Sequence, residues 1–208
     1  MDVKRARAIS RIIVATDPKF KDVVEFAGPA PFGLKKPNST SFESLTTSIL
    51  SQQLSIKAAD TIIKRVTEIA GGKINPESIS CLSERQLRGA GCSGAKARAV
   101  SELAEAAKSN SIPIRSLHRL NDDEIFAHLL PLFGIGQWTV EMFLMFQLGR
   151  PDIWPVGDLG VRRGWERIHR LKEEIEPKAL HLKGEKFAPY RSYVAWYCWR
   201  AIELYSLR

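Results

Sequence analysis

Apolar side chains recur every three or four residues along most of this chain, and alternating strand-like runs are few. That period is typical of helices with one buried face, so we expect an all-α fold. In the first third of the chain we expect helices over residues 3–15 and 20–26, from residue 42 to a break near Gln52-Gln53, and over residues 56–70. The proline-containing stretches 28–33 and 35–38 should form a loop, and Gly71-Gly72 should end the fourth helix.

Beyond residue 80, two helix starts are marked by short polar sequence signals. Ser83 and Asn121 each lie three residues before a Gln or Glu, which is the pattern of a capping box. Between them, residues 95–108 are rich in alanine and predict a further helix. Residues 137–148 predict another helix, with Val140, Phe143, Leu144 and Leu148 available to a core.

Composition narrows the class of protein. A chain of 208 residues with 44% apolar and 26% charged residues is long enough for one well-buried globular domain, which we expect to span residues 1–208. No apolar run is long enough to cross a membrane and the N-terminal residues lack a signal-peptide core, so we expect an intracellular protein.

The net charge of +8 fits nucleic-acid binding as well as it fits a merely basic surface. The three cysteines and four histidines are too scattered for a disulfide framework or a metal site, and we therefore expect no metal and no cofactor.

The segment 130–139, Leu-Pro-Leu-Phe-Gly-Ile-Gly-Gln-Trp-Thr, contains a glycine turn at Gly134 and Gly136, directly before a helix. The first amide groups of a helix have no partner inside it and attract anionic oxygens such as DNA phosphates. Asp158 follows Trp138 by 158 − 138 = 20 residues. From the residues alone, Asp158 is more readily an ordinary helix cap than a catalytic carboxylate.

Together with segments 48–59, 91–97 and 189–196, this stretch resembles the helix-hairpin-helix DNA glycosylases, in particular the monofunctional alkyl-base (3-methyladenine) glycosylases. The matching segments lie between about residues 42 and 200, in the family's order. The resemblance implies two helical lobes around a DNA-binding cleft, a hairpin over about residues 121–148 and a catalytic loop over 154–163. It makes Asp158 the catalytic carboxylate in base-excision repair of alkylated purines.

The resemblance also assigns residues that contact DNA. It places Trp138 and Met142 in the base pocket. For Trp199 a pocket role and simple packing in the last helix stay equally open, as do an intercalating plug and a core turn for Gln53 with Leu54. Besides the hairpin glycines, the residues expected to follow the phosphates are Lys96, Arg162, Arg163 and Arg191. We expect a monomer whose partner is double-stranded DNA containing damaged bases.

Bifunctional members of this family attack the sugar with a lysine two positions after the second hairpin glycine, where this chain has Trp138. The resemblance therefore implies hydrolysis by water without strand cleavage. One alternative is the same fold acting on deaminated or oxidised bases. Another is a non-catalytic module that only grips the DNA backbone, but such a module needs neither Asp158 nor Trp138.

Overall fold

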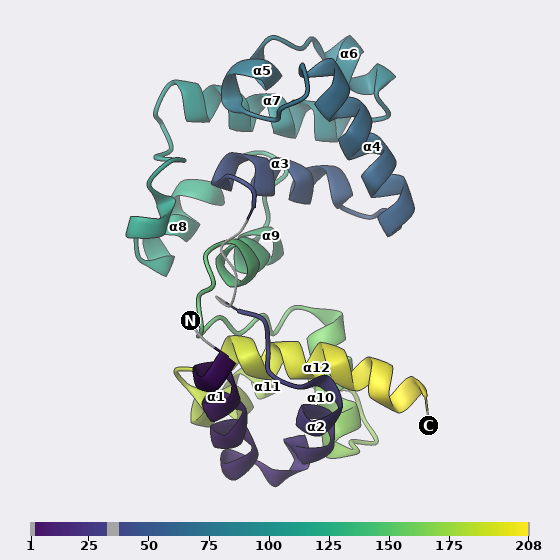
Figure 1. Ribbon diagram of the computed structural model, residues 1–208, viewed down its shortest axis with the longest axis vertical. Helices are drawn as coiled ribbons and strands as arrows, with labels where there is room; N and C mark the ends of the chain where they lie inside the picture. Colours follow the sequence, from purple (N-terminus) through teal and green to yellow (C-terminus); the bar gives the residue numbers. More distant parts are fainter. Residues whose placement is uncertain (1–2, 33–37, 208) are drawn as a thin grey trace. The chain divides into compact units, whose positions relative to one another are not determined.

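The computed structural model describes residues 3–32 and 38–207, and it forms two compact units (Figure 1). Unit 1 comprises residues 3–32 and 144–207, and unit 2 comprises residues 38–143. Within these described ranges the regular elements are all helices, which confirms the expected all-α class. Of the expected loop stretches 28–33 and 35–38, residues 33 and 35–37 lie outside the described part of the chain.

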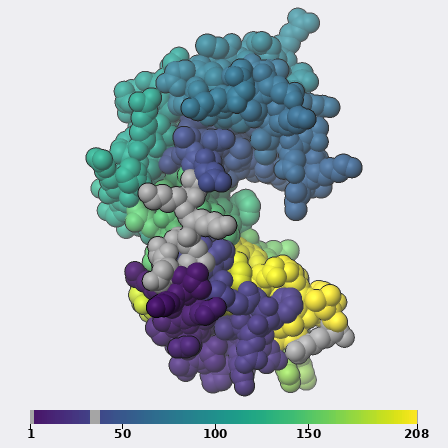
Figure 2. Space-filling view, in the orientation of Figure 1, coloured from purple at the N-terminus to yellow at the C-terminus, as the bar shows by residue number. Residues whose placement is uncertain are grey.

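Unit 1 is built around the C-terminal helix α12 (Arg191–Ser206), which packs against α10 (Leu159–His169) and α2 (Lys21–Ala27). Gly164 of α10 allows this close packing, because a Cβ there would lie 1.8 Å from the main-chain oxygen of Cys198. In Figure 2 the N-terminal atoms (purple) and the C-terminal atoms (yellow) share one surface of this unit. Its other elements are α1 (Val3–Thr16), η1 (Pro18–Phe20), α11 (Pro177–Gly184) and η4 (Glu185–Phe187).

Unit 2 packs α3 (Ser41–Ser51) and the short α5 (Pro76–Ser80) against α7 (Gly94–Lys108). Capping boxes start α6 (Glu84–Gly89) at Ser83 and α8 (Asp122–Leu129) at Asn121, as the sequence predicts. The remaining elements of this unit are α4 (Ile56–Ile69), η2 (Leu117–Arg119) and α9 (Gln137–Met142).

The helix predicted over residues 137–148 has a different form in the structure. The α-helical part, α9, ends at Met142, and residues Phe143–Gln147 form a π-helical turn, η3. A π-turn inserts one residue and rotates the side chains that follow it. As a result Met145 is fully buried while Phe146 is 51% exposed. Among the described residues, no helix is long and apolar enough to span a lipid bilayer.

Candidate active site

Asp158 is the N-cap of α10. Its φ and ψ of −71° and 122° are extended, and its Oδ1 accepts a hydrogen bond from the main-chain N–H of Val161 at 2.8 Å. The capping interpretation made from the residues is thus confirmed. A cap fixes the carboxylate at the positive end of the helix dipole, where a negative charge is stabilised. Capping therefore orients Asp158 and leaves a chemical role open to it.

Trp199 of α12 contacts the same carboxylate. Its indole Nε1–H donates to Oδ1 of Asp158 at 2.9 Å, and its ring stacks on Phe146 with 5.9 Å between the ring centroids and 29° between the planes. Gly160 makes room for this arrangement, because a Cβ there would lie 2.8 Å from Cδ1 of Trp199. Half-buried and bonded to Asp158, Trp199 is more than a packing residue of the last helix, although a contact with a base stays a prediction.

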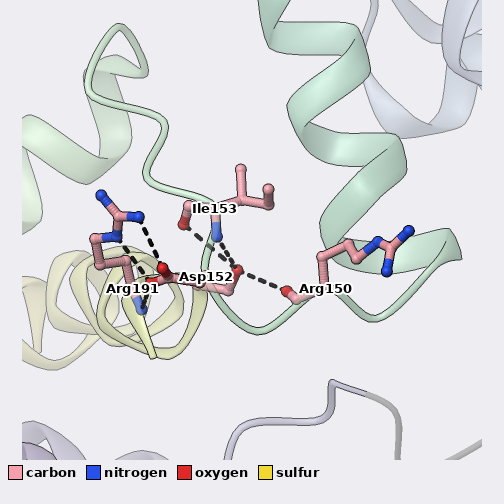
Figure 3. Close-up of polar contacts among 5 residues, drawn as sticks. Arg150, Asp152, Ile153 and Arg191 are labelled. Atoms are coloured by element: carbon pink, nitrogen blue, oxygen red, sulfur yellow. Dashed lines mark hydrogen bonds and ion pairs between the residues drawn. The ribbon is translucent and has the colours of Figure 1, made fainter. Parts of the chain in front are cut away.

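The loop that leads to Asp158 is tied to the start of α12 (Figure 3). Arg191 donates to both carboxylate oxygens of Asp152, at 2.8 and 2.7 Å. Next to it, the Ser192 hydroxyl accepts from the main-chain N–H of Ile153 at 2.8 Å and donates to the carbonyl oxygen of Arg150 at 2.7 Å. A bidentate ion pair together with a buried hydroxyl fixes a loop firmly. The Arg150 side chain points away from this cluster (Figure 3).

The two glycines of the turn in unit 2, Gly134 and Gly136, have different structural roles. Gly134 has a φ of +79°, and a Cβ on it would lie 2.6 Å from Cβ of Ala99 in α7, so both the conformation and the packing require glycine. Gly136 is the N-cap of α9 and has a φ of −96°, and a Cβ on it would meet nothing within 4 Å. The amides at the start of α9 are thus approachable past a position without a side chain, as a phosphate site requires.

A hollow of about 620 Å³ lies beside this turn, within unit 2. Trp138 and Met142 of α9 line it together with Gln53 and Leu54, which follow α3. Trp138 is 48% exposed, an unusual state for a tryptophan whose role is core packing. The structure therefore brings together four residues that the sequence assigned to the base pocket and to the plug.

The four cationic residues expected at phosphates have partners inside their own units. Arg191 pairs with Asp152, which raises the pKa of the guanidinium, and Arg163 pairs with Glu174 and Glu166, which has the same effect. Nη1 of Arg162 donates to the carbonyl oxygen of Ile175 at 3.5 Å. Lys96 donates to two carbonyl oxygens of α3 and its C-cap. Each of the four cations thus binds groups within its own unit, and a contact with DNA stays a prediction for all four.

Two residues near the site were missed in the sequence. Phe146 stacks on Trp199, and its signal was an aromatic outside the apolar stripe expected for residues 137–148. Gln52 donates from Nε2 to the carbonyl oxygen of Gly134 at 3.0 Å and to Oγ1 of Thr139 at 3.3 Å. Its only signal was its place beside the expected plug. In the described part of the chain, His, Cys, Asp and Glu side chains form no cluster that could hold a metal ion.

Comparison with known proteins gives the context for this site. Residues 46–189 match the family model described as HhH-GPD superfamily base excision DNA repair protein. DNA-3-methyladenine glycosylase 1 of Schizosaccharomyces pombe is 35% identical over 192 residues, which cover 90% of this chain and 84% of that protein.

Two solved structures that are similar to this chain are also named as 3-methyladenine DNA glycosylases or glycosidases. A crystal structure of DNA-3-methyladenine glycosidase from Bacillus halodurans has 35% identity and a TM-score of 0.83, covering 94% of this chain and 89% of that one. The structure of S. pombe 3-methyladenine DNA glycosylase (Mag1) in complex with abasic DNA has 32% identity and a TM-score of 0.83. The match covers 93% of this chain and 95% of that one.

Proposed function

We propose that this chain, which belongs to the HhH-GPD superfamily of base excision DNA repair proteins, is a DNA glycosylase that hydrolyses the N-glycosidic bond of alkylated purines. The observation that carries the proposal is Asp158, a carboxylate held at a helix start by the Val161 amide and the Trp199 indole. The glycosylase names of relatives 35% and 32% identical to this chain support it.

Asp158 acts on the sugar. As the bond between base and C1′ lengthens, positive charge develops on the deoxyribose, and a fixed anion stabilises it better than mobile water does. The hydrogen bonds from Val161 and Trp199 both end on Oδ1, so the carboxylate is oriented before substrate binds. Such preorganisation lowers the barrier because no reorganisation is needed during the reaction.

A single acidic group suffices for this class of substrate. A 3-methyladenine or 7-methylguanine base is already cationic and leaves without first receiving a proton. The indole face of Trp138 attracts such a cationic ring through its quadrupole, and its exposure in the hollow leaves it accessible to a base. Met142 on the next turn lines the same hollow and contributes apolar surface.

Base removal requires that the nucleotide leave the duplex, because the reacting bond is inaccessible inside it. Gln53 and Leu54 occupy the turn from which a side chain would fill the vacated stack. The hairpin glycines and the amides of α9 grip a phosphate and hold the protein in register. The partner is duplex DNA bound by one copy of the chain, and the place of action is the compartment that holds the genome.

Base release from methylated duplex DNA tests the proposal. Duplex DNA treated with a methylating agent is incubated with the protein, and the freed bases are separated by chromatography. We expect 3-methyladenine and 7-methylguanine among the products. Release of only hypoxanthine or 8-oxoguanine, from matched duplexes carrying those lesions, would move the protein to another substrate class. DNA binding without release of any base would make it a non-catalytic module.

A further inference from the structure

Lys96 lies in the first turn of α7, yet its ammonium group serves another helix. Nζ lies 2.8 Å from the carbonyl oxygen of Leu50 and 2.7 Å from that of Gln52. These carbonyls belong to the last turn and the C-cap of α3, where helix carbonyls have no partner within the helix and the dipole favours a cation. Lys96 is half-buried, and this burial lowers the pKa of its ammonium group.

Gln52 extends the arrangement to the hairpin. Its main-chain carbonyl oxygen accepts a hydrogen bond from Lys96. Its side-chain amide donates to the carbonyl oxygen of Gly134 and to Oγ1 of Thr139. Gly134 belongs to the hairpin turn, and Thr139 is a buried residue of α9, next to Trp138. One residue thus joins the end of α3, the hairpin turn and the helix that carries the base platform.

The residue after Gln52 is held in an unfavourable conformation. Gln53 has a φ of 55°, in the left-handed region that residues with a Cβ rarely occupy. Such a conformation persists only where its surroundings impose it, and it is concentrated at functional sites. The side chains nearby are open to solvent: Leu54 is 39% and Ile56 82% exposed. The contacts of Lys96 and Gln52 lie directly before this strained residue, and the main-chain N–H of Leu54 donates to the carbonyl oxygen of Ser51 across it.

We propose that Lys96 and Gln52 are positioning residues that form a latch between the plug turn, residues 52–55, and the hairpin. Through the latch, the phosphate grip of the hairpin sets the place at which the plug turn enters the base stack. Lys96 then contributes to base flipping through Gln52 and does not serve as a phosphate ligand. The latch rests on the proposed glycosylase function, because the position of a plug matters only in a protein that flips bases out of DNA.

Plug insertion is measured without the chemical step. A duplex carries an abasic-site analogue with 2-aminopurine beside it, and the fluorescence of 2-aminopurine reports the change in stacking when the plug enters. The variants are Lys96→Met, Gln52→Met and the double variant. Lys108→Met is the matched control, because Lys108 is an exposed lysine in the last turn of the same helix.

We expect each latch variant to slow the fluorescence change about 5- to 10-fold, since each loses one set of hydrogen bonds, while duplex affinity changes less than about two-fold. The double variant should be no slower than the slower single variant, because the two residues act as one unit. Lys108→Met should behave like the unaltered protein. Lys96→Arg, which keeps a donor and the charge, should recover part of the rate.

The salt dependence of duplex binding distinguishes the latch from a phosphate contact. A lysine that neutralises one phosphate contributes about 0.9 to the slope of log affinity against log salt concentration. We expect an unchanged slope for Lys96→Met. A slope reduced by about one, or normal insertion in either single variant, would overturn the latch. If Lys96→Met does not fold, Thr139→Val carries the insertion test, because it removes one acceptor of Gln52 and keeps the shape of Thr139.

The two proposals fail in different ways. Absence of base release by the unaltered protein contradicts the glycosylase function, and the insertion assay still decides on the latch because it uses an abasic duplex. Normal base release by the unaltered protein, with unchanged insertion in Gln52→Met, contradicts the latch alone.

Discussion

The indole Nε1–H of Trp199 and the main-chain N–H of Val161 converge on one oxygen of Asp158, at 2.9 and 2.8 Å. One donor comes from the helix that Asp158 caps and the other from the C-terminal helix. The carboxylate is therefore fixed by two elements, as a preorganised anion must be.

Asp158→Asn should abolish measurable excision, a fall of about 1,000-fold, and leave DNA affinity nearly unchanged. Asparagine caps helices as well as aspartate does and keeps an oxygen for both donors, while the negative charge is lost and the other oxygen becomes an NH2 group. Single-turnover base release and equilibrium binding to the same duplex measure the two effects. A near-normal single-turnover rate would show that the mechanism assigned to Asp158 is wrong.

Trp199→Phe should slow excision about 10-fold without changing DNA affinity, because it removes the hydrogen bond to Asp158 and keeps a ring to stack on Phe146. Gly160→Ala should have a similar effect, since its Cβ would displace the Trp199 ring. Urea unfolding verifies that both variants remain folded. An unchanged rate in Trp199→Phe would exclude a role of the hydrogen bond in the reaction.

Local signals in the sequence predicted local structure well. The capping boxes at Ser83 and Asn121 and the cap at Asp158 depend on residues three positions away, and all three are confirmed. The bond between Trp199 and Asp158 joins residues 41 positions apart, so only tertiary packing reveals it. The π-turn of η3 depends on the packing around residues 143–147 and has no sequence signal of its own.

Lys96 has contacts that its position in the sequence does not reveal. The sequence predicts a phosphate contact for Lys96 because it lies in a segment that resembles the DNA glycosylases, and that contact stays a prediction. In the structure its ammonium group binds carbonyl oxygens from residues 46 and 44 positions earlier in the chain. Periodicity shows which face of α7 is buried, but it does not show which carbonyls a long flexible side chain reaches.

Gly136→Leu should weaken binding to lesion-bearing and plain duplex alike, by about 10-fold, and change stability little. A Cβ at this position meets no protein atom within 4 Å, so we expect the added bulk to obstruct the approaching phosphate rather than the fold. Gly134→Ala should instead lower the free energy of unfolding by about 1–3 kcal/mol, through its positive φ and its contact with Ala99. Unchanged affinity of Gly136→Leu for both DNAs, across a salt series, would remove the hairpin from the binding site.

Asp17→Asn should destabilise the protein by about 2 kcal/mol at pH 7. Burial raises the pKa of Asp17, but hydrogen bonds from His169, Lys186 and the main chain of Lys19 outweigh it and lower the pKa from 3.8 to about 2. A lowered pKa in the folded state stabilises the fold above the unfolded value and loses that effect as the pH falls towards 2. The difference in unfolding free energy between the two proteins should therefore shrink below pH 4 in urea titrations, and a constant difference would contradict this account.

The protein should leave an intact abasic site and not cut the strand. A lyase needs an amine that attacks C1′ and forms a Schiff base, and the place two residues after Gly136 holds Trp138, whose indole is no such nucleophile. The sequence has no lysine between Lys108 and Lys172, a gap that contains the hairpin and the Asp158 loop. Borohydride added during turnover should therefore trap no protein–DNA adduct. A trapped adduct, or strand cleavage without alkali, would show that an amine elsewhere in the chain performs the reaction and that water activated beside Asp158 does not.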